Sequence, residues 1–264
     1  MTDILARAYV NSGHFFRTRL ETYLTMSRVQ TFVAEHDGRP AGMVVGNDYG
    51  KAAYVALMGV DPDLHRRGIG TALMDALIAW ADDRRFGCVE LDATPMGAPL
   101  YLRYGFGDSG ETNVYTIEHH GDFGSPSRAY SAADRDALFA CDREAFGADR
   151  SAVLERLLED DANAAFVEDA AGTLCGFAFA QPRAELIGPV IAPDMQTAAR
   201  LIRSAHACLR GPHRVAVPSE NTQAAEILAP HGFHLARSLR HMLRGTPPVA
   251  VRERIYARTN LGQG

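Results

Sequence analysis

One stretch of the chain limits its fold more than any other. An apolar run that ends at Val60 passes into a short basic loop, and an amphipathic pattern follows over residues 69–85. The loop carries two arginines and two glycines: Arg66, Arg67, Gly68 and Gly70. The pattern predicts a strand, a loop and a helix. A helix N-terminus presents unpaired N–H groups at the positive end of its dipole, glycine leaves those amides accessible, and arginine adds charge. The stretch therefore predicts a site for a pyrophosphate or another polyphosphate.

The spacing of this loop excludes two common phosphate-binding classes. A dinucleotide fingerprint, Gly-x-Gly-x-x-Gly, begins directly after its strand. Here seven residues separate Val60 from Gly68, and Leu73 stands where the third glycine belongs. A Walker A loop needs Gly-Lys-Ser/Thr, which the sequence lacks.

The same loop resembles the acetyl-CoA loop of the GNAT N-acetyltransferase superfamily. That family has Val-x-Pro before Gln/Arg-x-x-Gly-x-Gly/Ala, and this chain has Val60-Asp-Pro followed by Arg66-Arg-Gly-Ile-Gly-Thr71. His65 stands where the family usually has glutamine or arginine, which implies weaker or pH-sensitive CoA binding. The resemblance implies acetyl-CoA as co-substrate, without a metal. The implied contacts come from Met58, Val60, His65, Arg66, Arg67, Gly68, Ile69, Gly70, Thr71 and Thr94.

A second motif, residues 92–106, resembles the segment that closes the CoA cleft in the same family. The family pattern is Asn-x-x-Ala-x-x-Leu-Tyr-x-x-x-Gly-Phe, and Thr94 replaces its asparagine. Tyr101 matches the tyrosine that protonates the departing CoA thiolate in many members. A phenol suits this role because its ordinary pKa is near that of a thiol. The alternative for Tyr101 is a packed helix aromatic.

The residue that removes a proton from the acceptor amine is not given by either motif. Many relatives place a glutamate on the strand that corresponds to residues 54–60, which here contains no carboxylate. Glu90 and Asp92 lie two residues apart on the next predicted strand and therefore share one face. We expect them to act as base directly or through water, the alternative being a structural pair at the strand end.

Composition limits the classes of partner that the chain can bind. The 264 residues carry a net charge of −5 and no long basic run, which argues against nucleic-acid binding. Four scattered cysteines are typical of a reduced, cytoplasmic protein, and the histidines lack metal-ligand spacing. No apolar run approaches the length of a membrane span. We expect a small-molecule amine as the partner.

A break in the apolar pattern at residues 119–130 predicts two domains: 1–120 for acetyl-CoA binding and catalysis, a linker over 121–130, and 131–264. The first half predicts a mixed α/β (α+β) sheet with helices on both faces. Its strands are expected at 29–36, 40–47, 52–60, 87–93 and 111–118, and its helices at 3–10, 15–26, 69–85 and 97–104. The GNAT fold normally begins with a strand, and the sequence predicts none before the first helix. We expect this strand to be missing or cut off by the choice of start codon, which would leave a sheet edge exposed. A second subunit, giving a homodimer, or the other domain would cover it. Residues 14–17 begin the helix that usually roofs the acceptor site.

The second half repeats the first in outline, with strands at 164–168, 175–181 and 213–217 and helices at 150–159, 195–210 and 221–230. Its loop and helix start lack the glycines and the basic rim, and Leu228 stands in the place of Tyr101. The whole chain therefore resembles a tandem GNAT protein with an active first domain and a degenerate second domain that forms a wall of the acceptor pocket.

These observations predict an acetyl-CoA-dependent N-acetyltransferase that acts on the primary amine of a small molecule by direct attack, with Tyr101 as general acid. The alternative is a non-catalytic acyl-CoA-binding sensor that keeps the phosphate loop without a working base. A protein-acetylating enzyme ranks third, because the second domain would block a peptide groove.

Overall fold

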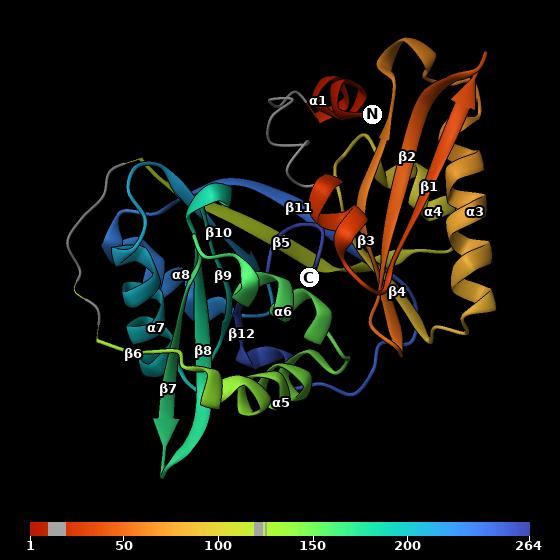
Figure 1. Ribbon diagram of the computed structural model, residues 1–264. Coiled ribbons are helices and arrows are strands. Elements are labelled where there is room, and N and C mark those ends of the chain that lie inside the picture. Colours follow the sequence, from red (N-terminus) through yellow and green to blue (C-terminus); the bar gives the residue numbers. More distant parts are fainter. Residues whose placement is uncertain (10–19, 119–123, 125) are drawn as a thin grey trace. The chain divides into compact units, whose positions relative to one another are not determined.

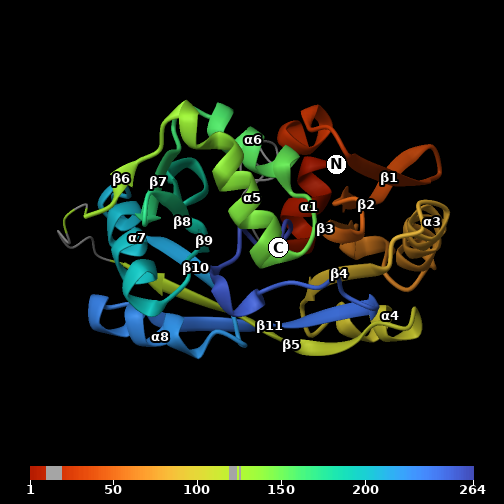
Figure 2. The ribbon, with the colours of Figure 1, turned by 90° about the horizontal axis from the view of Figure 1, so that it is seen from below.

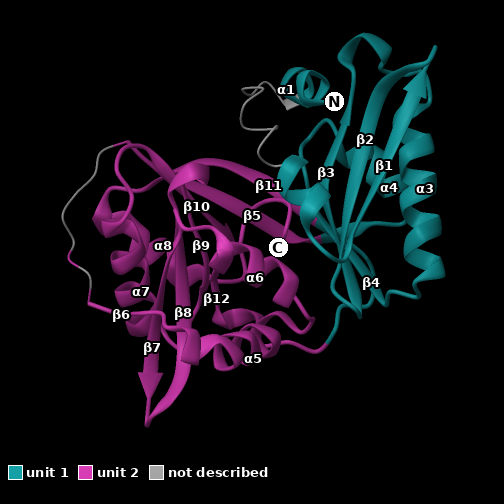
Figure 3. Cartoon of the chain, viewed as in Figure 1, with its two compact units in different colours: residues 1–108, 242–248 teal, residues 109–241, 249–264 magenta. Residues whose placement is uncertain are grey.

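The computed structural model describes residues 1–9, 20–118, 124 and 126–264 (Figure 1). The chain divides into two compact units. Unit 1 comprises residues 1–108 and 242–248, and unit 2 comprises residues 109–241 and 249–264 (Figure 3). The expected boundary near residue 120 thus differs from the observed division, because each unit takes a strand from the other half of the sequence.

Unit 1 is built around a mixed sheet with strand order β1-β2-β3-β4, followed by the end of β11. Strand β2 is antiparallel to both β1 and β3, whereas β3 and β4 are parallel. In chain order the elements are α1 (Thr2–Tyr9), β1 (Val29–His36), β2 (Arg39–Asp48), β3 (Ala52–Val60), α3 (Ile69–Asp83), β4 (Cys88–Ala93) and α4 (Ala98–Arg103). Residues 20–25 are also helical.

Helices cover both faces of this sheet, as predicted. The apolar positions of α3 recur at helical spacing and pack on one face of β2, β3 and β4, in a cluster that includes Val44, Val55 and Leu91. Leu5 of α1 packs with Met43 and its neighbours on the opposite face. Figure 1 shows α3 and α1 on the two sides of β1–β3.

Unit 2 has strand order β11-β5-β10-β9-β8-β7-β6, with β12 also paired to β9. Its elements are β5 (Gly107–Ile117), β6 (Arg128–Ala129), α5 (Arg135–Phe146), α6 (Ser151–Glu159), β7 (Ala164–Ala170), β8 (Thr173–Gln181), β9 (Leu186–Ile191), α7 (Met195–Ala207), β10 (His213–Pro218), α8 (Thr222–Leu228), β11 (His234–Gly245) and β12 (Ile255–Ala257). On β8, Ala178 and Ala180 pack in the cluster that contains the α7 residues. The views agree that α5 lies on the other side of β8 from α7 (Figure 2).

The end of β11 completes unit 1. Met242 is fully buried in the cluster beneath α3. The guanidinium of Arg244 pairs with the carboxylate of Asp82 on α3 at 2.9 Å. The amide of Thr246 donates to the carbonyl of Gly87 at 2.8 Å. A segment more than 130 residues after α4 therefore supplies part of the core of unit 1.

Most elements of the first half agree with the predicted positions, whereas β9 and β12 have no counterpart among the predicted strands. Residues 10–19, 119–123 and 125 lie outside the described part of the chain. The predicted roof of the acceptor site at residues 14–17 falls within these residues. Part of the predicted linker does too, whereas residues 124 and 126–130 are described.

Candidate active site

Strands β3 and β4 part at the centre of unit 1. They pair in parallel from Ala52–Cys88 to Tyr54–Glu90, although β3 continues to Val60 and β4 to Ala93. No further pair joins them in the described part of the chain. The edge of β3 beyond residue 54 is thus turned toward an opening between two strands of one sheet.

The loop between β3 and α3 begins with a short 3₁₀ turn, residues 62–64. The loop has two acidic side chains, Asp61 and Asp63. The guanidinium of Arg7 on α1 pairs with both, at 3.1 Å from Asp61 and 2.6 Å from Asp63. This pairing reduces their repulsion of an anion at the loop, although both pairs are partly exposed and therefore weak.

The basic part of the loop is exposed and ends at a bare helix N-terminus. Arg66, Arg67 and Gly68 are all solvent-exposed. Gly68 is the N-cap of α3, with φ of +82° and no side-chain capping bond. A Cβ added there would meet no atom within 4 Å. The first amide bonded into the helix is that of Ala72, on the carbonyl of Gly68 at 2.9 Å. The amides of residues 69–71 are therefore available to an anion.

Two other predicted loop contacts are directed toward neighbouring strands. Nε2 of His65 lies 3.2 Å from the carbonyl oxygen of Val60. Because a carbonyl only accepts, Nε2 carries the proton. Nη1 of Arg67 lies 3.4 Å from Nε2 of His36 on β1. Arg66, which has a left-handed φ of +62°, is the remaining arginine of the rim.

The end of β3, the start of α3 and α4 converge beside this loop. The hydroxyl of Tyr101 on α4 lies 3.6 Å from the sulfur of Met58 on β3. Tyr101 is 9% exposed and stacks edge-on against Phe106 at 5.9 Å. A Cβ built on Gly70 would lie 3.6 Å from Met58 and 3.8 Å from Val60. The structure therefore brings together the phosphate end and the proposed acid end of the predicted site.

The carboxylates of Glu90 and Asp92 both lie on the face of β4 that points away from α3, since Val89 and Leu91 pack in the α3 cluster. Glu90 is 1% exposed, and the thiol of Cys88 lies 3.8 Å from its Oε1. Asp92 is only half-buried and accepts a 2.7 Å hydrogen bond from the hydroxyl of Tyr54. Asp92 is thus the more accessible of the two.

Thr94 and Tyr104 position α4. The hydroxyl of Thr94 accepts from the amide of Gly97 at 3.2 Å, within the turn that starts α4. The hydroxyl of Tyr104 lies 2.9 Å from the carbonyl of Thr71 and 2.6 Å from Asp75, both on α3. Burial and the bond to Asp75 raise the pKa of Tyr104 to about 12. Tyr104 was not predicted from the sequence, although it directly precedes the Gly-Phe pair of the second motif.

In unit 2 the helix that follows the corresponding strand is capped differently. The carboxylate of Asp194 accepts from the amide of Thr197 at 2.8 Å at the start of α7. That bond is the main reason why the pKa of Asp194 is lowered. Leu228, at the position that corresponds to Tyr101, is fully buried. An internal carboxylate thus occupies the helix end that an external anion would use.

Within residues 1–9, 20–118, 124 and 126–264, no helix is long and apolar enough to cross a membrane. Over the same residues, no group of three or more histidine, cysteine, aspartate or glutamate side chains is arranged to hold a metal ion.

Comparison with known proteins identifies the family. The acetyltransferase (GNAT) family model matches residues 1–106, and an acetyltransferase (GNAT) domain model matches residues 138–257. The uncharacterized N-acetyltransferase YitH of Bacillus subtilis (strain 168) is 31% identical over 192 residues, which cover 70% of this chain and 67% of that protein. The chain belongs to the GNAT acetyltransferase family and carries two such domains in tandem, which confirms the predicted resemblance.

Solved structures share this fold. A putative acetyltransferase from Pyrococcus horikoshii has a TM-score of 0.86 at 24% identity, over 100% of this chain and 91% of that one. A tandem GNAT protein from the clavulanic acid biosynthesis pathway has a TM-score of 0.60 at 17% identity, over 94% of each chain. The predicted mixed α/β fold in two tandem domains is thereby confirmed.

Proposed function

We propose that this chain transfers an acetyl group from acetyl-CoA to the primary amine of a small molecule, at a site in unit 1. The observation that carries the proposal is the convergence of three elements beside the opening between β3 and β4. These are the bare N-terminus of α3, the end of β3 at Met58 and the hydroxyl of Tyr101 on α4.

The residues fit the phosphate end of acetyl-CoA. The space over Gly68 is open, the first amides of α3 have no side-chain cap, and Arg66 is exposed at the rim. A pyrophosphate on these amides would gain charge-assisted hydrogen bonds and the favourable end of the helix dipole. Gly70 lets the start of α3 pack close to Met58 and Val60 of β3, so the phosphate end of the site lies beside the end of β3.

Acyl transfer needs a proton donor for the leaving thiolate, and Tyr101 is placed for it. Its hydroxyl already lies 3.6 Å from one sulfur atom, that of Met58. The same position suits a thiolate that replaces or adjoins this contact. The backbone of β3 beyond residue 54 offers amides that would polarise the thioester carbonyl.

For the base that deprotonates the acceptor ammonium, the geometry favours Asp92 over Glu90. Asp92 retains exposure, and Tyr54 fixes its orientation at the point where β3 and β4 part. Glu90 is buried, and its carboxylate lies beside the thiol of Cys88. We assign Asp92 as base, acting directly or through one water molecule.

The experiment is an assay of free CoA thiol with acetyl-CoA and a panel of small primary amines. We expect turnover with at least one amine. Tyr101→Phe should lower kcat about 100-fold, within the range for loss of a general acid, while acetyl-CoA affinity stays within twofold. Tyr23→Phe is the matched control, since this buried tyrosine hydroxyl has no hydrogen-bond partner among the described residues.

The alternative, a non-catalytic acyl-CoA sensor, keeps the phosphate site and lacks turnover. Tight acetyl-CoA binding without thiol release for any amine would favour it over the enzyme. Asp92→Asn separates the two further, because it would abolish turnover in the enzyme and leave binding by a sensor unchanged.

The partner we propose is a small-molecule amine, and the net charge of −5 disfavours binding to nucleic acid. We also propose a homodimer through β1, which lies at the end of the strand order of unit 1. Sedimentation equilibrium would test the dimer, and a monomer at high concentration would contradict it.

A further inference from the structure

We infer that unit 2 contains a strand-binding slot equivalent to the opening in unit 1, and that its ligand is a segment of the same chain. We name residues 254–259 the strap. The comparison of the two openings rests on the proposed function, in which acetyl-CoA lies in the opening of unit 1. The occupancy of the second opening rests on contacts within unit 2 alone.

The two openings have the same topology. In unit 1, β3 leads through α3 to the parallel strand β4, and in unit 2, β9 leads through α7 to the parallel strand β10. The pairing of β9 with β10 is brief, from Leu186–Arg214 to Ile187–Val215, before the strands part. Each unit thus has one opening between two parallel strands.

The strap fills the opening in unit 2 with backbone hydrogen bonds to both sides. On one side β12 pairs antiparallel with β9, with Ile255 opposite Ile191 and Ala257 opposite Val190. On the other side the amide of Arg258 donates to the carbonyl of Ala216 on β10 at 2.7 Å. Peptide groups of the strap therefore satisfy the facing edges of β9 and β10.

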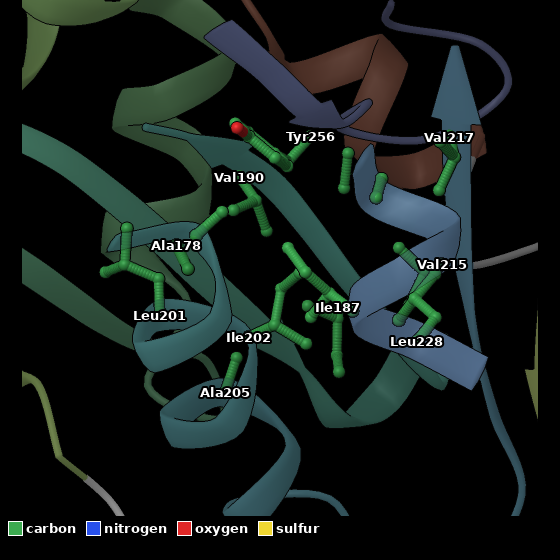
Figure 4. Packing of buried hydrophobic residues seen from close by; sticks show 14 of the residues in the cluster. Ala178, Ile187, Val190, Leu201, Ile202, Ala205, Val215, Val217, Leu228 and Tyr256 are labelled. Atoms are coloured by element: carbon green, nitrogen blue, oxygen red, sulfur yellow. The ribbon is translucent and has the colours of Figure 1, made fainter. Parts of the chain in front are cut away.

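Side chains hold the strap in the core of unit 2. Tyr256 is 2% exposed, lies beside Val190 (Figure 4), and donates from its hydroxyl to Gln223 on α8 at 2.6 Å. The side-chain amide of Asn221 donates to the carbonyls of residues 253 and 255 at 3.0 and 3.1 Å. Thr259 is fully buried and accepts from Arg150 at 3.0 Å.

The fit of the strap against β9 depends on a glycine. Gly188 has φ of +151°, and a Cβ built on it would lie 2.1 Å from the carbonyl oxygen of Arg258. No side chain fits at that distance from a backbone atom. The side chain of Gln181 donates to the carbonyls of both Gly188 and Thr259, which joins the strap to the β8–β9 side of the slot.

The strap and Asp194 together close both parts of a cofactor site in unit 2. The strap takes the place between the strands, and the carboxylate of Asp194 takes the helix N-terminus. Unit 2 therefore binds its own peptide, and the chain has a single acetyl-CoA site.

Hydrogen exchange of the full chain, followed by mass spectrometry, tests this inference without any need for activity. We expect amides of residues 255–259 to exchange within tenfold of the rate of β9, since both open together. Exchange of the strap more than 100-fold faster than β9 would overturn the inference.

Two glycine variants provide a second test. Gly188→Ala should raise strap exchange at least 100-fold or prevent folding, whereas Gly211→Ala is the control, since Gly211 also has a positive φ (+88°) and no atom within 4 Å of a built Cβ. Wild-type-like exchange in Gly188→Ala would contradict the inference, and if that variant does not fold, the wild-type rates decide.

Acetyl-CoA added to the same samples separates the two proposals. It should slow exchange at residues 66–71 and leave the strap unchanged. No effect anywhere, with a protected strap, would overturn the proposed function and leave the strap in place. Acetyl-CoA that alters the strap would overturn the closed slot.

Discussion

The hydroxyl of Tyr54 donates a 2.7 Å hydrogen bond to Oδ2 of Asp92 across the point where β3 and β4 part. Tyr54 is 1% exposed, so its ring is fixed by packing. The bond holds a half-buried carboxylate at the mouth of the opening in unit 1, where the proposed reaction needs a base.

Tyr54→Phe removes this bond and keeps the ring. A hydrogen bond to a charged group contributes about 1.5–3 kcal/mol, and the partial exposure of Asp92 places the expected effect at the lower end. We predict that kcat falls about tenfold while the dissociation constant of acetyl-CoA stays within twofold. Steady-state kinetics and a binding titration measure the two. An unchanged kcat, as expected for Tyr23→Phe, would show that Tyr54 does not position the base.

Gly68→Ala tests the phosphate end of the site. The substitution forces an alanine to a φ of +82°, which costs roughly 1 kcal/mol, and it places a methyl group in the open space beside the N-terminus of α3, where we propose that the phosphate binds. Gly172→Ala carries the same strain in unit 2, at φ of +78° with open space around it. We predict similar losses of stability in both variants, and at least tenfold weaker acetyl-CoA binding only in Gly68→Ala. Equal affinity in the two would contradict the assigned phosphate site.

Asp194 makes the unfolding free energy of unit 2 depend on pH. Its hydrogen bond from the Thr197 amide lowers its pKa below the unfolded value, so the stabilisation is present above that value and is lost as the pH falls through the folded pKa. Asp194→Asn keeps a good N-cap without the titration. We predict that the variant loses less unfolding free energy than the wild type between pH 5 and pH 3, two values chosen to bracket the ordinary aspartate pKa. Denaturant unfolding at each pH provides the measurement, and parallel pH profiles would contradict the assignment.

The buried pair of Arg150 and Asp142 should be costly to break. The guanidinium donates to both carboxylate oxygens, at 2.6 and 3.2 Å, and the two side chains are 0% and 1% exposed. Asp142→Ala would leave a buried charge, so we predict a loss of about 3–5 kcal/mol in unfolding free energy. Glu155→Ala, which breaks the exposed pair with Arg135, should cost under about 1 kcal/mol. A similar small cost for both would show that Arg150 gains other partners or water.

Local sequence patterns predicted the elements of unit 1 well, because its strands and α3 have strong periodicity. These patterns do not predict which unit a strand joins. Met242 lies in the core of unit 1 although its strand belongs to the second half of the sequence. The strap is short and carries Arg254 and Arg258, so its pattern gives no strand signal. Only the three-dimensional pairing shows that β12 enters a sheet.

Part of the candidate site was likewise predicted from the sequence, and part of it was not. The glycine and arginine spacing indicated the anion site at α3, and a period of two placed Glu90 and Asp92 on one face. The bond between Tyr54 and Asp92 joins residues 38 positions apart, and it depends on the register of β3 against β4, which sequence spacing does not specify.

We propose a single acetyl-CoA site per chain, in unit 1. Calorimetric titration of the full chain with acetyl-CoA tests this most directly, because the stoichiometry gives the number of acetyl-CoA sites per chain. We predict one equivalent per chain in the wild type and in Gly172→Ala, with binding weakened at least tenfold in Gly68→Ala. Two equivalents would contradict the closed slot of unit 2, and no binding at millimolar acetyl-CoA would contradict the proposed function itself.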